Sequence, residues 1–357
     1  MLGRPRRLAL LAEGRFTPTE AKTAVGVLRY RPAEVAAVVD SGRAGRTCRD
    51  CVGVGGDTPV VRDVAAAAAV GADGLMIGVA PQGGALPGEW RGSVLDALAR
   101  GWDVLSGLHE FLADDPQLAA AAAATGARLL DLRRPPARRP MAAGRAAGLA
   151  ATVVLTVGSD CNAGKMTAAV EIVRALAARG ARAAFVATGQ TGLCVGEGGV
   201  ALDAVPSDFV AGFTEELVLE AARGADYVVV EGQGSLAHPA YSGVALGILH
   251  GACPAAMVLC HPVGRTHLRV SAAPDGFAIP PLAELVRRHE TAAGWVRPAR
   301  VVGVALNTHG LDEPAARAAC TAAARETGRA AADPVRFGAE PLADALAALR
   351  RDHAPAA

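Results

Sequence analysis

A glycine-bounded loop between an apolar strand and a helix constrains the fold of this chain more than any other feature. The residues before the loop, Thr152–Val157, are predicted to form a strand, and those after it, Lys165–Arg179, a helix. Gly158 and Gly164 let the backbone wrap around an anion, helix N–H groups point towards it, and Lys165 neutralises terminal phosphates. The segment therefore predicts a nucleotide-phosphate site in a parallel α/β sheet. The alternative is a glycine-rich turn before an ordinary helix.

The loop departs in two ways from the common phosphate-binding pattern. Five residues, rather than four, separate its glycines, a spacing that resembles dethiobiotin synthetases and related amidotransferase-type P-loop enzymes. Met166 stands where a serine or threonine usually binds Mg²⁺, so Thr167 is the predicted Mg²⁺ ligand. Asp160 is predicted to position a metal-bound water or an amine. The predicted nucleotide-binding residues are Gly158, Ser159, Cys161, Asn162, Ala163, Gly164, Lys165, Met166 and Thr167.

A second apolar run, Tyr227–Glu231, ends in a carboxylate and is followed by Gly-Gln-Gly. An acidic residue at the carboxyl end of a strand is the usual holder of Mg²⁺ in P-loop enzymes. Glu231 is therefore predicted to bind Mg²⁺ and to be catalytic together with Lys165 and Asp160. Gln233, two residues further on, is a candidate substrate contact.

Polar residues follow three further predicted strands of this half. The carboxyl ends of parallel strands share one edge of the sheet, where ligands bind. Arg265 suits a phosphate or a carboxylate, and Asn307 is a candidate adenine contact. For each of these residues the alternative is an ordinary loop or turn residue. The candidate substrate contacts here are Gln190, Thr191, Asp208, His261 and Arg265.

Only two lysines occur among the 36 basic residues, so a lysine that survives this preference for arginine is a candidate for a chemical role. One is Lys165. The other, Lys22, lies on the first predicted helix and is a candidate to bind a substrate carboxylate; the alternative is a surface lysine. His109 follows a short predicted strand and is a candidate to line a cleft between domains. Cys48 and Cys51 have C-x-x-C spacing without a second pair, so no metal or redox role is expected.

Strands alternate with helices along the chain, which predicts parallel α/β sheets. The expected strands are 8–12, 34–40, 74–79, 102–105, 152–157, 183–188, 227–231, 255–261, 301–307 and 335–337, and the expected helices are 20–29, 63–70, 90–100, 165–179, 207–223, 281–290, 313–326 and 340–350. Thr19 and Ser207 are predicted N-caps. Residues 133–147, rich in Pro, Arg and Ala, predict a linker, so we expect domains at 1–137 and 138–357.

Composition excludes several classes of protein. The chain has 357 residues, 51% of them hydrophobic, which suffices for a sizeable core and excludes disorder as the main state. A net charge of +1 and an aromatic content of 4% give no basis for a nucleic-acid partner. Seven irregularly spaced cysteines indicate a reducing compartment, and no apolar run suits a membrane span or a signal peptide. We therefore expect a cytoplasmic protein without a membrane partner.

Several motifs occur together and in order. They are SGLHEFLADDP, LDLRRPP, GSDCNAGKMT, ATGQTG and VEGQGSLAHPAYSG. With the two lysine segments, this set resembles a family long catalogued only as a domain of unknown function, over essentially the whole chain. The resemblance implies an N-terminal Rossmann-like domain and a C-terminal P-loop domain. Some members are described as D-glutamate N-acetyltransferases, so the resemblance also implies N-acylation of an amino acid.

The residues themselves favour ATP–Mg²⁺ chemistry. In this first hypothesis ATP phosphorylates a substrate carboxylate, and an amine attacks the acyl phosphate to give an amide. The alternative, implied by the resemblance, is transfer from acetyl-CoA to D-glutamate or a similar D-amino acid, with the loop holding the phosphates of CoA. A third hypothesis is a non-catalytic nucleotide-dependent switch. We expect a small-molecule amino-acid or carboxylate substrate and a homo-oligomer.

Overall fold

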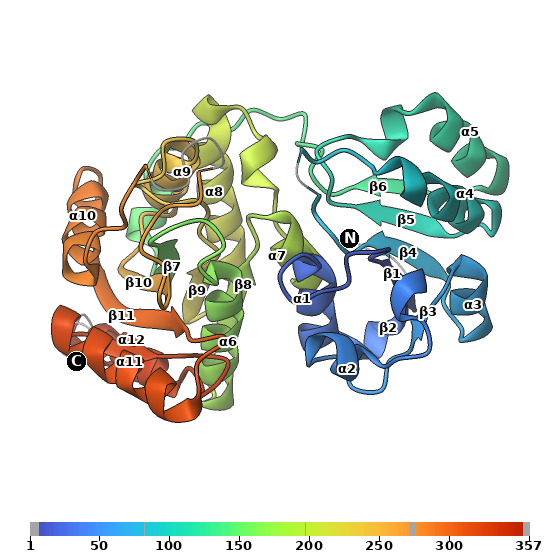
Figure 1. Cartoon of the computed structure of the whole chain (residues 1–357). Coiled ribbons are helices and arrows are strands. Elements are labelled where there is room, and N and C mark those ends of the chain that lie inside the picture. Colours follow the sequence, from blue (N-terminus) through green and yellow to red (C-terminus); the bar gives the residue numbers. More distant parts are fainter. Residues whose placement is uncertain (1–6, 82, 197, 271–275, 353–357) are drawn as a thin grey trace. The chain divides into compact units, whose positions relative to one another are not determined.

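The chain folds into two compact units, each built on a six-stranded sheet with helices around it (Figure 1). This computed structural model describes residues 7–81, 83–196, 198–270 and 276–352. Unit 1 contains the described residues up to Pro136 together with Gln190–Ala204, and unit 2 contains the described remainder. The prediction of two α/β domains with parallel sheets is confirmed.

All neighbouring strands of the unit 1 sheet are parallel, in the order β3-β2-β1-β4-β5-β6. Its strands are β1 (Leu8–Leu11), β2 (Val35–Val39), β3 (Val60–Val61), β4 (Gly74–Ile77), β5 (Asp103–Ser106) and β6 (Leu129–Asp131). Every residue of β1 and β2 is buried, as expected for apolar strands of a parallel sheet covered by helices. The strand order is that of a Rossmann-type sheet.

Unit 1 has short helices, of which two begin at aspartate caps. The helices are α1 (Lys22–Tyr30), α2 (Cys48–Val52), α3 (Val64–Ala69), α4 (Arg91–Ala99), α5 (Pro116–Thr125) and α7 (Gln190–Val195). Asp63 caps α3 and Asp115 caps α5, each accepting backbone N–H bonds. The prediction that Thr19 caps the first helix is wrong. That helix has Ala21 at its N-cap without a side-chain bond, and the Gly78 carbonyl accepts an N–H of its first turn.

Residues 190–204 follow a strand of unit 2 but belong to unit 1. Helix α7 contacts α1, and the hydroxyls of Thr23 and Thr191 lie 3.1 Å apart. Cys194 is part of the unit 1 core. Arg133 donates to the Gln190 side chain over 2.9 Å and forms an ion pair with Asp203. The core of unit 1 is therefore completed by a segment that lies far along the chain.

The sheet of unit 2 is also parallel, in the order β12-β11-β10-β7-β9-β8. Its strands are β7 (Thr152–Gly158), β8 (Ala183–Val186), β9 (Tyr227–Val230), β10 (Ala256–Pro262), β11 (Arg300–Asn307) and β12 (Ala330–Ala332). β7 lies between β10 and β9, so its carboxyl end is central. The predicted strand Val335–Phe337 is wrong, because the Asp333 carboxylate accepts N–H bonds from Val335 and Arg336 and holds this segment in a turn.

The helices of unit 2 cover its sheet. They are α6 (Lys165–Ala178), α8 (Ser207–Ala221), α9 (Ser242–Ala252), α10 (Leu282–Gly294), α11 (Glu313–Thr327) and α12 (Glu340–Asp352). Helices α6 and α12 share one hydrophobic cluster with Val154, Val229 and Val258 of the sheet. Ser207 is the first helical residue and not the predicted N-cap. That position belongs to Pro206, whose carbonyl accepts the N–H of Phe209.

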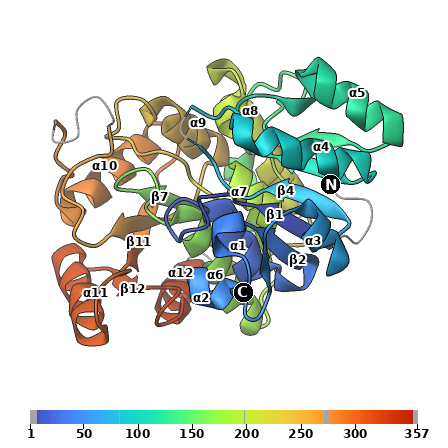
Figure 2. The same cartoon turned by 45° about the vertical axis from the view of Figure 1, so that its right-hand side comes forward.

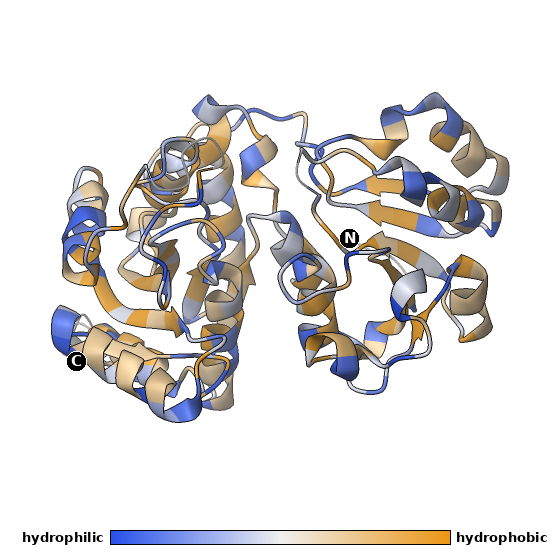
Figure 3. Cartoon of the chain, viewed as in Figure 1, coloured by the Kyte–Doolittle hydropathy of each residue, from blue (hydrophilic) through white to orange (hydrophobic). Residues whose placement is uncertain are grey.

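In each unit helices lie beside the strands of the sheet (Figure 2). Hydrophobic residues concentrate in these strands, and the helices are of mixed hydropathy (Figure 3). The predicted linker, 133–147, is mostly exposed and has no long helix or strand. It is held to α8 by the buried Glu215, whose carboxylate accepts N–H bonds from Ala143 and Arg145. Among the described residues, no helix has the length and apolar character that crossing a membrane requires.

Candidate functional site

The predicted phosphate-binding loop, residues 158–167 and here called the P-loop, lies at the carboxyl end of β7 and leads into α6. Gly164, the N-cap of α6, has φ +95°, and Asn162 has φ +51°. Both values lie in the left-handed region, which glycine enters without steric cost. This backbone path is typical of loops that curl around a bound anion.

The backbone of the P-loop forms a cradle of free N–H groups. Across the described parts of the chain, no protein group accepts a hydrogen bond from the N–H of any residue from Asn162 to Thr167. The last three of these residues form the first turn of α6, whose helix dipole adds positive potential. Gathered N–H groups at a helix start bind phosphate oxygens. The structure thus fits the phosphate groups that the sequence predicted for this loop.

Lys165 is buried in the P-loop, with an exposed fraction of 7%. Its Nζ donates hydrogen bonds of 2.8 Å to the carbonyl oxygens of Asp160 and Gly234. Burial lowers the pKa of Lys165, and the neighbouring thiols and carboxylates oppose that shift. An ammonium whose acceptors among the described residues are two neutral carbonyls is well placed to exchange them for an anion.

Asp160 is fully buried and holds the P-loop to the segment after β10. One carboxylate oxygen accepts the Cys161 N–H over 2.7 Å. The other accepts Nη1 of Arg265 over 2.9 Å and the N–H of Arg269 over 3.1 Å. The Nη1 of Arg265 also donates to the Cys161 carbonyl over 2.7 Å. Two residues predicted to contact ligands, Asp160 and Arg265, therefore form an ion pair with each other, and the remaining N–H groups of Arg265 have no acceptor among the described residues.

Glu231 lies directly after β9, where the sequence predicted an acidic residue beside the P-loop. Its Oε2 accepts N–H bonds from Thr188 (3.0 Å) and Gly189 (3.2 Å). Burial raises the pKa of Glu231 to about 7, and the two N–H bonds and the charge of Lys165 oppose the shift. The chain passes very close to β7 here, because a Cβ on Gly232 would lie 1.8 Å from the Thr156 carbonyl oxygen.

Two more predicted residues, Gln233 and His261, adjoin these groups. The Gln233 side chain donates to the Thr188 carbonyl. Nδ1 of His261 lies 2.9 Å from the Ser159 hydroxyl, and burial lowers the pKa of His261. The Ser235 hydroxyl donates to the Ser159 carbonyl over 3.1 Å, a contact that the sequence analysis missed although Ser235 ends the Glu-Gly-Gln-Gly-Ser run. Hydrogen bonds therefore link the ends of β9 and β10 to the P-loop, and the loop after β9 to the loop after β8.

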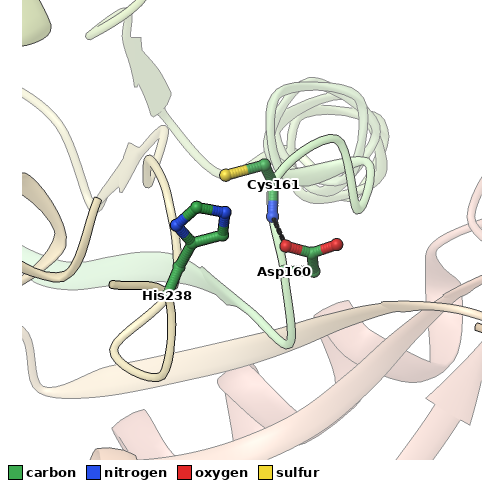
Figure 4. A group of neighbouring side chains, drawn as sticks. All are labelled: Asp160, Cys161 and His238. Carbon is green, nitrogen blue, oxygen red and sulfur yellow. Dashed lines mark hydrogen bonds between the residues drawn. The ribbon is translucent and has the colours of Figure 1, made fainter. Parts of the chain in front are cut away.

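Asp160, Cys161 and His238 form a compact group, with one potential metal-ligand atom of each within 4.8 Å of the others (Figure 4). Nδ1 of His238 accepts the Ala240 N–H, so Nε2 carries the proton and donates to the Arg269 carbonyl. Burial raises the pKa of the Cys161 thiol to about 11. Since Arg265 already neutralises Asp160 and both nitrogens of His238 are bonded to backbone, this group does not fit a metal ion and instead fixes the loops.

His289 of α10 is a further buried residue that the sequence analysis did not single out. It lines a small pocket with residues of β7, the 232–236 loop and α9, with room for about one water molecule. Its Nδ1 donates to the Leu285 carbonyl over 2.8 Å, and burial lowers its pKa to about 4. His289 is therefore neutral at pH 7. A single histidine in a helical pattern gives no signal by which the sequence could have found it.

The remaining predicted residues lie at the end of β11, on α8 or in unit 1. Asn307 is exposed at the end of β11, where its side chain accepts the N–H of His309, as a turn-forming asparagine does. Asp208 is exposed in the first turn of α8 and makes no hydrogen bond or ion pair with a described residue. The residues located in unit 1 are Lys22, His109, Gln190 and Thr191. Gln190 and Thr191 hold α7 in that unit, and burial lowers the pKa of His109.

A Rossmann-type sheet in one unit and a P-loop on a parallel sheet in the other define a two-domain α/β protein of the P-loop class. Family models agree with this class. A domain of unknown function described as the DUF1611 P-loop domain matches residues 140–343, and one described as the DUF1611 Rossmann-like domain matches residues 41–135. The chain belongs to the DUF1611 family.

Relatives cover nearly the whole chain. A protein of Tritonibacter scottomollicae named D-glutamate N-acetyltransferase is 39% identical over 92% of this chain and 95% of its own length. One of the same name from a Pseudoalteromonas species is 33% identical over 77% of this chain and 82% of its own length. The crystal structure of a DUF1611 family protein from Anabaena variabilis superposes with a TM-score of 0.91 at 40% identity, covering 96% of this chain and 99% of that one. The resemblance stated from the motifs is thereby confirmed.

Proposed function

We propose that this protein transfers an acetyl group from acetyl-CoA to the amine of D-glutamate or of a similar acidic D-amino acid. The observation that carries the proposal is the 39% identity to a D-glutamate N-acetyltransferase over 92% of the chain. The phosphate cradle supports it, because coenzyme A carries a phosphorylated adenosine diphosphate that a P-loop can bind. Acetyl transfer from acetyl-CoA was the alternative hypothesis drawn from the sequence, and it now ranks above the ATP-dependent formation of an amide.

In the proposed reaction the neutral amine nitrogen attacks the thioester carbonyl carbon. The C–S bond breaks and coenzyme A leaves with the electron pair of that bond as a thiolate. The nitrogen loses a proton as the amide forms, and the thiolate takes up a proton to give the free thiol. We assign the diphosphate of coenzyme A to Lys165, Arg265 and the free N–H groups of the P-loop.

The test is an assay of purified protein with acetyl-CoA and D-glutamate, which follows thiol release and identifies N-acetylglutamate by mass spectrometry. We expect turnover with D-glutamate, and a fall in kcat/KM of about 100-fold or more for Lys165→Ala, which removes the cation at the phosphates. Arg174→Ala, on the same helix but 63% exposed in a surface ion pair with Glu171, is the matched control and should retain activity. An absence of thiol release with any acidic amino acid would overturn the proposal.

A second candidate is the ATP-dependent formation of an amide. It is favoured by one observation: Lys165 and Glu231 interact electrostatically at the two positions where P-loop enzymes hold a triphosphate and its Mg²⁺. In that reaction Thr167 and Glu231 would hold Mg²⁺. Release of ADP that depends on both a carboxylate and an amine, without release of coenzyme A, would favour this candidate over acetyl transfer.

A further inference from the structure

We infer that the P-loop binds the diphosphate of its nucleotide ligand without a divalent cation. The inference rests on the proposed function, because it takes coenzyme A as that ligand. P-loop enzymes that use nucleoside triphosphates normally hold Mg²⁺ through a hydroxyl beside the P-loop lysine and an acidic residue at a neighbouring strand end. Both parts of this donor set differ here.

The hydroxyl is missing from its usual place. Met166, directly after Lys165, has a thioether, which is a soft ligand unsuited to Mg²⁺. Thr167 has the nearest hydroxyl on α6, but it lies one residue further along. Successive helical residues point about 100° apart around the axis, so the Thr167 side chain leaves the helix in a different direction from the usual ligand.

The carboxylates near the P-loop already have partners. Oε2 of Glu231 accepts two backbone N–H bonds, so at most its other oxygen is left for a metal-bound water. Asp160 is paired with Arg265 and accepts two backbone N–H bonds as well. Mg²⁺ requires near-octahedral oxygen coordination, so recruiting either carboxylate would break bonds that hold the loops together.

Cations of the protein itself replace the metal. Within the described part of the chain, the hydrogen bonds of the Lys165 ammonium go to two neutral carbonyls. Arg265, 15% exposed, has N–H groups beyond Nη1 without an acceptor among the same residues. The free N–H groups from Asn162 to Thr167 add further donors. Together they offset the charge of a diphosphate, which is bound without hydrolysis when coenzyme A is the ligand and therefore needs no metal to stabilise a transferring phosphoryl group.

The test is calorimetric titration of the full chain with coenzyme A, once with Mg²⁺ and once with EDTA. We expect dissociation constants that agree within about twofold. Two variants refine the comparison: Thr167→Val removes the hydroxyl at nearly constant shape, and Thr167→Ser keeps it. For each variant, the affinity for coenzyme A should be the same with Mg²⁺ as with EDTA. An affinity of the wild type for coenzyme A about tenfold or more higher with Mg²⁺ than with EDTA would overturn the inference. If Thr167→Val lost this increase while Thr167→Ser kept it, the hydroxyl would be identified as a metal ligand.

Acetyl transfer measured in the same two buffers separates this inference from the proposed function. Transfer in both buffers supports both. Transfer only with Mg²⁺ overturns the inference and leaves the function standing. Equal binding of coenzyme A in both buffers without transfer to any acidic amino acid overturns the function and supports cation-free binding. A protein that binds no coenzyme A in either buffer contradicts both.

Discussion

Lys165 shows how one side chain links the fold of the P-loop to its ligand. Its ammonium closes the loop by bonding to the carbonyls of Asp160 and Gly234, on two different loops. The would-be Cβ of Gly158 lies 2.7 Å from Nζ, so the space around the ammonium is tight. A planar guanidinium would not fit there, which gives a physical reason for one of only two lysines in a chain rich in arginine.

A second residue, Glu231, makes the stability of the protein depend on pH. Burial raises its pKa from 4.5 to about 7 in the folded chain, so between these values the folded state binds more protons than the unfolded state. This contribution is fully present below pH 4.5 and is lost as the pH rises through about 7. Glu231→Gln removes the ionisation. The free energy of unfolding of the variant, relative to wild type, should therefore rise across this window by on the order of 3 kcal/mol.

The measurement is urea unfolding of the ligand-free proteins at a series of pH values. The exposed Glu220→Gln, on α8, is the control and should show a flat difference from wild type. A flat difference for Glu231→Gln would mean that burial does not raise the pKa of Glu231 in the folded chain.

At the scale of elements, helices α8 and α9 pack together through glycines. A Cβ on Gly251 would lie 2.2 Å from the Ala211 carbonyl oxygen, and one on Gly247 would lie 2.8 Å from Cγ1 of Val210. These contacts are with backbone and with a stiff β-branched side chain. A side chain at either glycine would therefore fit only if the two helices moved apart. α9 was not predicted, because it is apolar around its whole circumference and contains three glycines.

Gly251→Ala should destabilise unit 2 by about 3 kcal/mol, because the added methyl group forces α8 and α9 apart. Gly243 lies on the same helix with no atom within 4 Å of its would-be Cβ. Gly243→Ala should therefore stabilise the protein by about 0.5–1 kcal/mol, since alanine restricts the unfolded chain. Denaturant midpoints of the two variants give the comparison; equal and small shifts for both would show that the helices do not depend on this close approach.

At the scale of the whole molecule, the segment Gln190–Ala204 gives unit 1 residues from the second half of the chain. Arg133, 11% exposed, joins the parts by donating to the Gly107 carbonyl and the Gln190 side chain and by pairing with Asp203. A largely buried charged group with several hydrogen-bond partners is costly to remove, because those partners lose their hydrogen bonds.

Arg133→Ala should therefore loosen the described residues of 190–204 and helix α1. Hydrogen exchange of the full chain should accelerate about tenfold or more in these two segments, while exchange in β7 and α6 of unit 2 stays unchanged. Arg134→Ala, next in sequence and 45% exposed, is the control. Unchanged protection of α1 and α7 in Arg133→Ala would mean that the arginine does not hold this segment.

The sequence by itself determined the alternation of strands and helices and the position of the P-loop. Both are local properties: an apolar run predicts a buried strand, and glycines before a helix with a lysine predict an anion cradle at its start. Thr152–Val157 and Lys165–Arg179 were therefore found to within a residue or two. The motif set also pointed to the family that the comparisons show.

Only the tertiary structure decided which polar groups meet. Asp160 and Arg265, 105 positions apart, pair with each other. His289 of α10 lines the pocket beside β7 together with residues of α9. Likewise α7 packs with unit 1, and the turn at Val335–Phe337 depends on the Asp333 carboxylate rather than on its own apolar residues. Such choices follow from long-range packing and hydrogen bonding, which overrule local preference because a buried polar group left without a partner costs more than a residue in a disfavoured element gains.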